Sequence, residues 1–444
     1  MVGLADIIIW QYYFFQKDKK ENYLGITDWD KYRDQQFQTF IYNLNQPYLR
    51  VTESSFTNVS IYDRPYLESL FSTTEFPDGT FGIEHIDEIL EFQKHFMKIV
   101  SKVRMDSMMT YPVLTYALLF QNGKFVDEET AKWANKHNMK WNDSNFYLGE
   151  DISTLSSCCR VLNDFSKLNG KNQSLGFINS IGGTSLKIGS VQVNTTNLAR
   201  LALKSGLDYE VYKHNLIENI EISLKLLDVI RGIIKRNVEK GLLPAYNYKL
   251  IELERQYSTI GITGMFSMIE MFGEIQVDQF GNKSYTEKGK QIATDTMDII
   301  NEIKDKFAET KDYLINLEAV PGETANVKLA RKDILLYGYE KVKTNMYGNQ
   351  WIPLTEKCTN KEKIELSSLL DRRAGGGQIL HVNLDAPFSD EEQSWKMLNY
   401  IANKKVIYFA YNVKISACED NHGFYGDICH CGKPAIETYS RVVG

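Results

Sequence analysis

The sequence CEDNHGFYGDICHCGKPAIETYSRVVG, residues 418–444, is the stretch around which the rest of the chain is interpreted. It contains three of the six cysteines and two of the seven histidines. Cys418 lies four positions before His422, and Cys429 lies two positions before Cys431. Zinc in structural sites takes four such ligands in a tetrahedron, usually from two short loops that fold together. The spacing therefore predicts a structural zinc site whose ligands are Cys418, His422, Cys429 and Cys431.

The ligand set has alternatives within the same stretch. A single residue between Cys429 and Cys431 is shorter than the usual two, so His430 can replace one of them. Asp420 and Asp427 are weaker candidates, and a site without metal is the remaining interpretation. The tight turns that aim such ligands at one point are supplied by glycines, namely Gly423, Gly426 and Gly432.

The residues that follow the ligand pattern, Arg441-Val442-Val443-Gly444, resemble a known radical motif. They are similar to the glycyl radical loop of the anaerobic, class III ribonucleotide reductases, where Arg-Val-x-Gly is followed by an aromatic residue. A radical on a glycine Cα is stabilised by the flanking amides, and this requires a flat centre that a side chain would crowd. The resemblance implies a glycyl radical on Gly444 and a zinc ion that is purely structural.

Composition and charge are those of a large enzyme. A chain of 444 residues with 43% hydrophobic and 24% charged residues predicts one large barrel or two domains. A net charge of -6 gives no electrostatic reason to expect nucleic acid or an anionic membrane as a partner. The cysteines do not form a secreted disulfide framework, which favours a reducing cytoplasm, that of the host if the chain is phage-encoded.

Apolar periodicity predicts helices that alternate with strands. Residues 82–107 carry an apolar stripe at helical spacing, and residues 111–115 then form a buried strand. Residues 215–239 predict a long surface helix, and residues 406–411 predict the strand that leads to Cys418. This alternation favours an α/β fold with helices outside.

The resemblance makes the fold more specific. It implies a ten-stranded α/β barrel of the glycyl radical enzyme and ribonucleotide reductase type over residues 1–413. A zinc-binding and glycyl radical domain then follows over residues 414–444. The family also has an N-terminal ATP cone and a first barrel strand with a second active-site cysteine, and neither is found here. We therefore expect part of a split or truncated, phage-like reductase that is inactive without a separate N-terminal polypeptide.

The adjacent cysteines Cys158 and Cys159, flanked by serine and arginine, suit a loop tip. Two buried thiols that act as small hydrophobic groups are the alternative. The resemblance implies that this loop lies inside the barrel and carries the thiyl radical that removes the 3′ hydrogen of the ribose. Cys158 is favoured as the radical site, because it places Asn179 at the family's substrate-binding asparagine. Without that role, Asn179 would cap the glycine turn at 182–183.

Three further residues are predicted to bind substrate. Asn58 lies where a polar loop enters a strand, although an ordinary barrel strand with an asparagine at its mouth explains it equally well. Glu323 and Thr324 follow Pro321-Gly322 at a predicted helix start, where unpaired amides can bind a phosphate. A capped helix entry is the alternative for these two residues.

The function implied by the resemblance is the anaerobic reduction of ribonucleoside triphosphates to 2′-deoxyribonucleotides. The expected partners are a radical-SAM activating enzyme that forms the radical on Gly444, formate as reductant, and a second copy of the chain in an allosterically regulated homodimer. One alternative is a formate-lyase type glycyl radical enzyme, which shares the adjacent cysteines but lacks the zinc knuckle. The other is a non-catalytic zinc-knuckle module.

Overall fold

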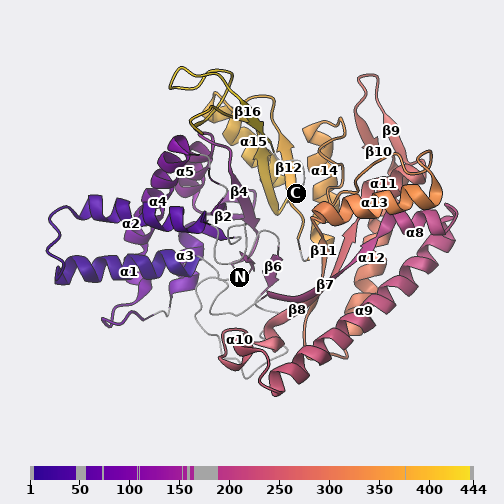
Figure 1. Ribbon diagram of the computed structural model, residues 1–444, viewed down its shortest axis with the longest axis horizontal. Coiled ribbons are helices and arrows are strands. Elements are labelled where there is room, and N and C mark those ends of the chain that lie inside the picture. Colours follow the sequence, from indigo (N-terminus) through magenta and orange to yellow (C-terminus); the bar gives the residue numbers. More distant parts are fainter. Residues whose placement is uncertain are drawn as a thin grey trace.

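The computed structural model describes residues 5–46, 57–72, 75–107, 109, 111–152, 154–157, 161–164, 189–375 and 377–440. Two sheets with helices on their outer sides form the body of a mixed α/β molecule, and a small sheet follows near the end of the chain (Figure 1). The expected alternation of helices and strands is therefore confirmed.

The first sheet is built from strands that are far apart in sequence. Its path is β1-β2-β4-β13-β12, with β3 paired to β2. The pairs β1/β2, β2/β4 and β12/β13 are parallel, and β13 runs antiparallel to β4. The strands are β1 (Asn58–Tyr62), β2 (Val113–Gln121), β3 (Lys124–Phe125), β4 (Ser144–Gly149), β12 (Leu380–Asn383) and β13 (Tyr408–Asn412).

The two faces of this sheet differ in polarity because side chains alternate along each strand. One row of paired residues across the sheet is apolar, and it consists of Ile61, Tyr116, Phe146, Phe409 and Leu380. The next row along the strands is Ser60, Thr115, Asn145, Ala410 and His381, and it is mostly polar. The apolar row belongs to the hydrophobic core under the helices, and the other face therefore carries buried polar groups.

Six helices accompany the first sheet, and aspartate side chains cap the N-termini of several of them. The expected helix over 82–107 is confirmed as the 3₁₀ turn Gly82–His85 followed by α4. The helices are α1 (Ala5–Glu21), α2 (Trp29–Leu44), α3 (Arg64–Phe71), α4 (Ile86–Asp106), α5 (Glu128–Asn138) and α15 (Glu391–Asn403).

The second sheet has three parallel strands in the order β11-β8-β7. Its strands are β7 (Gly189–Asn197), β8 (Gln256–Thr263) and β11 (Ile315–Ala319). A second hydrophobic core packs against it. Its helices are α8 (Leu198–Lys204), α9 (Tyr209–Glu239), α10 (Pro244–Asn247), α11 (Met265–Met271), α12 (Glu287–Ala308), α13 (Glu323–Tyr337) and α14 (Asn360–Leu370).

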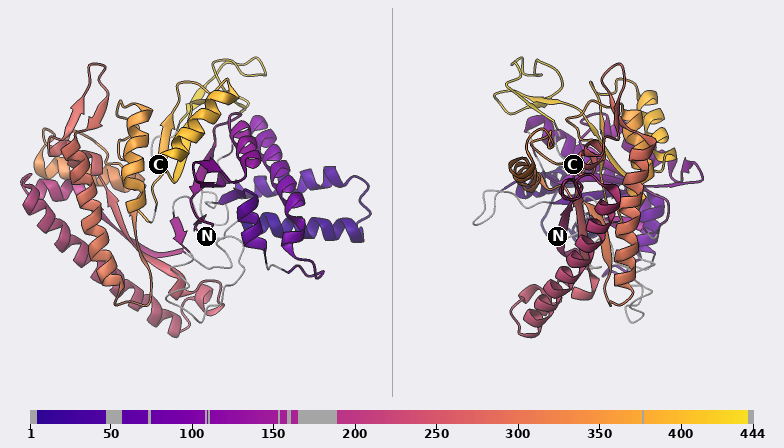
Figure 2. Two further views of the ribbon diagram at one scale, coloured as in Figure 1. Left: turned by 180° about the vertical axis from the view of Figure 1, so that it is seen from behind. Right: turned by 90° about the vertical axis from the view of Figure 1, so that its right-hand side faces the viewer.

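The long helix α9 starts earlier than the sequence indicates. The apolar pattern is clear only from residue 215, but the Asp208 side chain accepts a hydrogen bond from the Val211 amide and begins the helix at Tyr209. Figure 2 shows α9 and α12 on the outer side of the second sheet, and the two helices pack against each other.

The two sheets meet at one edge. Glu318 of β11 forms a parallel bridge with Gly377, and the Ala319 amide donates to the Gly377 carbonyl at 3.2 Å. Because Gly377 lies just before β12, this bridge joins the second sheet to the edge of the first. The strands of these two sheets therefore form one curved wall whose helices lie outside (Figure 1).

Smaller elements complete the fold. The hairpin β5 (Thr154–Ser157) and β6 (Val161–Asp164) follows β4, and the hairpin β9 (Ile275–Val277) and β10 (Lys283–Tyr285) projects beside α11. A three-stranded sheet contains β14 (Ile415–Ala417), β15 (Gly423–Phe424) and β16 (Glu437–Tyr439). Of the helices in the described ranges, none has the length and apolar character that crossing a membrane demands.

Candidate metal centre and active-site face

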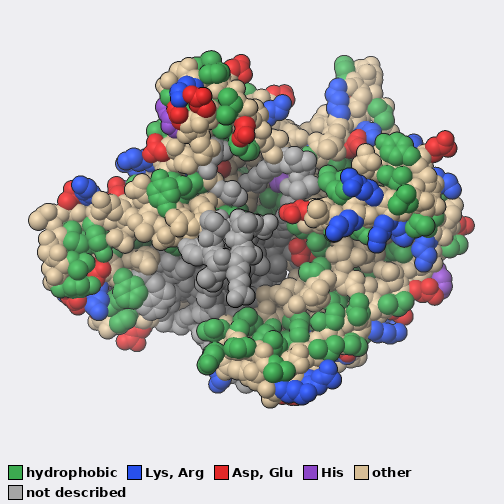
Figure 3. Space-filling model, viewed as in Figure 1, with side chains coloured by type: hydrophobic (Ala, Val, Ile, Leu, Met, Phe, Trp, Pro, Cys, Tyr) green, Lys and Arg blue, Asp and Glu red, His purple; other side chains and the backbone are tan. Residues whose placement is uncertain are grey.

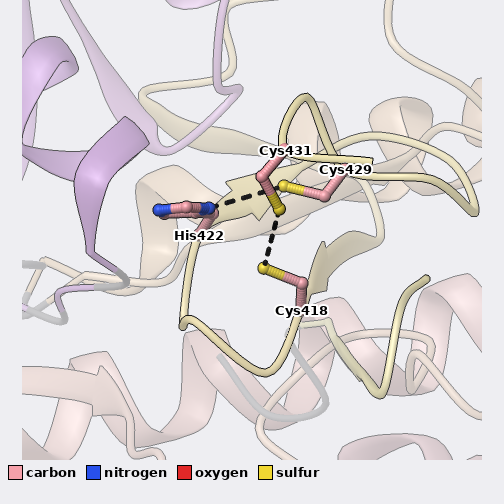
Figure 4. Close-up of side chains that lie close together, drawn as sticks. All are labelled: Cys418, His422, Cys429 and Cys431. Carbon is pink, nitrogen blue, oxygen red and sulfur yellow. Dashed lines mark hydrogen bonds between the residues drawn. The ribbon is translucent and has the colours of Figure 1, made fainter. Parts of the chain in front are cut away.

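The four predicted metal ligands converge near the end of the chain. The ligand atoms of Cys418, His422, Cys429 and Cys431 all lie within 4.8 Å of one another (Figure 4). Cys418 Sγ lies 3.9 Å from Cys431 Sγ, and Cys429 Sγ lies 3.6 Å from His422 Nδ1. The sequence prediction that two short ligand pairs fold onto each other is confirmed.

These distances fit a tetrahedral zinc ion. Zn–S bonds of about 2.3 Å and Zn–N bonds of about 2.0 Å place two sulfurs about 3.8 Å apart and a sulfur and a nitrogen about 3.5 Å apart. Three cysteines and one histidine are also the soft and borderline ligands that zinc prefers. His430 Nδ1 lies 3.5 Å from Cys429 Sγ, but His430 is outside the converging group of four.

Two tight turns hold the ligands in place. The Asn421 amide donates to the Cys418 carbonyl at 2.9 Å, and the Gly432 amide donates to the Cys429 carbonyl at 2.9 Å. Gly432 has a φ of 86°, which only glycine adopts at little cost. Strand β14 runs directly into Cys418 and fixes the position of the first turn.

Cys158, Cys159, Asn179 and Gly444 lie outside the described residues. Strands β5 and β6 are paired through Ser157 and Val161, so the segment that joins them by sequence is 158–160. The roles of these four residues remain predictions.

Asn58 lies at the start of β1, on the polar face of the first sheet. Its Nδ2 donates to Thr115 Oγ1 at 3.4 Å, and Thr115 Oγ1 lies 3.1 Å from the Tyr408 hydroxyl. Asn145 Nδ2 donates to the same hydroxyl at 2.7 Å. Thr115, Asn145 and Tyr408 are almost fully buried, so this hydrogen-bonded row is a fixed part of the sheet.

The sequence did not predict the hydrogen-bonded row of Thr115, Asn145 and Tyr408 to which Asn58 donates. Its members lie on β2, β4 and β13, and only strand pairing brings them together. A signal was present, because Thr115 and Asn145 are polar residues at alternating positions of otherwise apolar strands. Such positions face away from the apolar core and are candidates for an active-site wall.

Glu323 and Thr324 lie at the N-terminus of α13 and are exposed. The N-cap residue Gly322 makes no side-chain cap, and Glu323 has the left-handed φ of 39°. A Cβ at Gly322 would lie 2.4 Å from Asn326 Oδ1, so the chain needs glycine at this turn. The predicted strand-to-helix junction is confirmed, whereas phosphate binding there remains a prediction.

A buried carboxylate ties α13 to the rest of the second sheet. Asp333 is fully buried and ion-pairs with Arg200, and it accepts hydrogen bonds from Asn197 Nδ2 at 3.0 Å and the Tyr347 hydroxyl at 2.7 Å. Burial, followed by the bond to Asp333, raises the pKa of Tyr347, so its hydroxyl stays a donor. Asn197 also caps α8 through the Arg200 amide. The Asn197-Leu198-Ala199-Arg200 motif therefore serves to anchor α13.

Comparison with known proteins extends these observations to the whole chain. The model of the anaerobic ribonucleoside-triphosphate reductase family matches residues 2–444. The anaerobic ribonucleotide reductase of Thermotoga maritima, solved with glycerol in its active site, is 41% identical over 99% of this chain and 69% of its own, with a TM-score of 0.88. A second solved anaerobic ribonucleotide reductase is 41% identical over 99% of this chain and 67% of its own, with a TM-score of 0.89.

A third structure, the Thermotoga maritima enzyme in complex with dATP and CTP, is also 41% identical. It covers 99% of this chain and 71% of its own, with a TM-score of 0.88. A comparison with curated protein sequences gave no match. The whole-length match sets aside the formate-lyase and zinc-knuckle alternatives. The chain belongs to the family of the anaerobic, class III ribonucleotide reductases.

Proposed function

We propose that this chain, as part of a split or truncated enzyme, reduces ribonucleoside triphosphates to 2′-deoxyribonucleotides under anaerobic conditions by a glycyl and thiyl radical mechanism. The observation that carries the proposal is the family match from residue 2 to residue 444, because it includes both the cysteine pair and the terminal glycine. The converging Cys3His group directly before the terminal motif supports it.

The radical is stored on Gly444 and used on Cys158, with Cys159 as its neighbour. A radical-SAM activating enzyme removes a hydrogen atom from Gly444. The glycyl radical would take the hydrogen atom of the Cys158 thiol. The resulting thiyl radical would then take the 3′ hydrogen atom of the ribose, and the 2′ hydroxyl would leave as water after protonation. Formate supplies the electrons and is oxidised to carbon dioxide, and the 3′ hydrogen atom is returned. The protein orients the ribose and excludes water and oxygen.

The substrate is a nucleotide whose phosphates and ribose are bound by different parts of the wall. A homologous enzyme was solved with CTP and dATP, which supports nucleotides as ligands here. Glu323 and Thr324 offer the uncapped amides of α13 to the phosphates. Asn58 and Asn179 bind the ribose, with Asn58 held by Thr115 on the polar face.

The wall of described strands is part of a ten-stranded barrel of the reductase type. Residues 1–413 form this barrel, and residues 414–444 form a separate zinc and radical domain with its own small core around Phe424. Zinc on the Cys3His group has a structural role, because the group contains four protein ligands and leaves no open position.

The active form is a homodimer that associates through α9. Four exposed apolar residues on this helix, Ile222, Leu226, Val229 and Ile233, are spaced by four, three and four positions. This is the spacing of a seam that packs against a second helix of the same kind. Apolar side chains gather over α9 and α10 along the lower edge of Figure 3. A second copy would cover this patch by two-fold symmetry.

The experiment that tests the function is anaerobic activation followed by turnover. The purified chain is incubated with a radical-SAM activating enzyme, S-adenosylmethionine and dithionite, and the glycyl radical is measured by electron paramagnetic resonance. CTP and formate are then added, and dCTP is measured by chromatography. With the separate N-terminal polypeptide of the enzyme also added, we expect a radical signal and dCTP that depends on formate; without that polypeptide we expect no dCTP.

Matched variants assign the residues. Gly444→Ala removes the radical signal and the product. Cys158→Ser keeps the radical signal but gives no dCTP, whereas Cys159→Ser retains the signal and more activity than Cys158→Ser. A radical signal that persists in Gly444→Ala would contradict the proposed storage site.

A further inference from the structure

The metal-binding module, defined as residues 414–440, is held together mainly by its own contacts. Strand β14 pairs with both β15 and β16, and Ser416 Oγ donates to the Gly426 carbonyl at 2.7 Å. Cys418, Phe424 and Cys429 form a core that is separate from the cores of the body. With a metal on its four ligands, the module is a rigid unit.

The contact between this module and the body centres on Tyr425. Asn142 Nδ2 donates to the Tyr425 hydroxyl at 3.2 Å, and the Tyr425 ring lies 6.2 Å from the Trp141 ring. A second contact joins Asn421 Nδ2 to Ser107 Oγ at 3.3 Å, where the module lies beside α4. Tyr425 lies between the ligands His422 and Cys429, so the metal site fixes both ends of the loop that presents it.

The body presents its side of the contact equally firmly. Asn142 is almost fully buried, and its Nδ2 also donates to the Met139 carbonyl at 3.3 Å. Its backbone has a left-handed φ of 48°, which holds the side chain at the turn before β4. Asn142 therefore offers its amide to Tyr425 from a fixed position.

The rest of the boundary between module and body is loosely packed. A cavity of about 260 Å³ lies there, lined by Trp141, Asn142 and Tyr411 of the body and by Ile415, Tyr439 and Ser440 of the module. Within the described part of the chain, the buried atoms Trp141 Nε1 and Asn142 Oδ1 have no hydrogen-bond partner. Beside this cavity, the contacts of Tyr425 with Asn142 and Trp141 join the module directly to the body.

We propose that Tyr425 is a positioning residue for the radical reaction, because it docks the metal-binding module on the body and thereby sets where the module ends relative to the first sheet. Ser440, on the wall of the cavity, directly precedes residues 441–444. A shift of the module at this boundary is therefore passed on to Gly444. The proposal rests on the proposed storage of the radical on Gly444 and its use on Cys158.

A positioning role predicts that loss of docking affects radical formation and turnover per radical differently. A purely structural role predicts that both fall together. An external activating enzyme needs only access to Gly444, so radical formation does not require a docked module. Turnover requires that the radical pass from the same residue to Cys158. Loss of docking therefore leaves the radical per chain unchanged and lowers the turnover per radical.

The experiment compares Tyr425→Ala and Tyr425→Phe with the wild-type chain. Zinc per chain, the glycyl radical signal and dCTP formation per radical are measured. We expect unchanged zinc and radical, and a turnover per radical that falls at least about tenfold in Tyr425→Ala, because small misplacements of reacting groups are costly. Tyr425→Phe keeps the ring and loses one hydrogen bond, so we expect a fall of about threefold. Tyr23→Phe, an exposed tyrosine bonded to Asp18, is the control and stays at the wild-type level.

The partner residue provides a second test. Asn142→Gly removes the amide and keeps the left-handed backbone without strain. If the hydroxyl acts through Asn142, the double variant Asn142→Gly, Tyr425→Phe has the same turnover per radical as either single variant. The proposal would be overturned if the effects of the two single variants on turnover per radical multiply in the double variant. Equal turnover per radical in Tyr425→Ala and wild type would also overturn it.

Hydrogen exchange separates this proposal from the proposed function. Body amides beneath the module, in residues 139–145, exchange faster in Tyr425→Ala than in wild type while zinc is retained, and this holds with or without a radical. If the wild-type chain forms no radical, the proposed function is wrong. Hydrogen exchange then still tests whether Tyr425 docks the module on the body. Unchanged exchange in Tyr425→Ala refutes the docking role by itself.

Discussion

Replacing the buried carboxylate Asp333 by an amide is the sharpest test of how α13 is held. Asp333→Asn keeps the shape of the side chain but removes its charge. Its new amide nitrogen faces donors, since Arg200 and Asn197 both donate to Asp333. The variant thus loses the ion pair and places a donor against a donor.

The structure sets the size of the effect. Asp333 is 0% exposed and Arg200 is 27% exposed, so the pair lies mostly in the interior. Removing one partner of a buried pair costs about 3–5 kcal/mol, and the partial exposure of Arg200 favours about 3 kcal/mol. The unfolding entropy of a 444-residue chain is about 0.9 kcal/mol/K, which converts this loss to a decrease of about 3 °C in Tm.

Calorimetry under anaerobic conditions measures the Tm, and hydrogen exchange of the α13 amides locates the change. The matched control is Asp298→Asn, which breaks the ion pair with Arg373 at a side chain that is 57% exposed. An exposed pair contributes about 0–1 kcal/mol, so the control shifts the Tm by less than about 1 °C. Equal shifts in the two variants would refute the anchoring role, as would unchanged exchange in α13.

Three further predictions concern the metal, the dimer and pH. Cys429→Ser lowers the zinc content measured by mass spectrometry to near zero, whereas Cys358→Ser, outside the ligand group, retains about one zinc per chain. Leu226→Glu on α9 converts the dimer to a monomer in light scattering, and the equally apolar but distant Leu335→Glu leaves the mass unchanged. Burial raises the pKa of Asp63 to about 7, so the stability that its protonated form contributes is complete below about pH 4 and is lost as the pH rises towards 7. Asp63→Asn therefore shows a smaller decrease in urea midpoint between pH 4 and 7 than wild type, and equal decreases would contradict this.

Local pattern was sufficient for the elements and for the metal site. The apolar stripe of residues 82–107 and the apolar run of residues 406–411 correspond to α4 and β13 because period and burial are short-range properties. Cys418 and Cys431 converge because each lies in its own short turn, and the second turn contains Gly432 at a φ that favours glycine. The sequence missed the start of α9, since the cap at Asp208 precedes its apolar pattern.

The sequence by itself determined the alternation of helices and strands, the candidate metal ligands and the family resemblance, because each depends on neighbours within a few turns of chain. Only the tertiary structure decided which distant residues meet. Asn58 reaches Tyr408 through Thr115, and Arg200 reaches Asp333, across 350 and 133 positions of sequence. Tyr425 meets Asn142 in the same way. Strand register and the packing of whole elements set these contacts, and no local spacing encodes them.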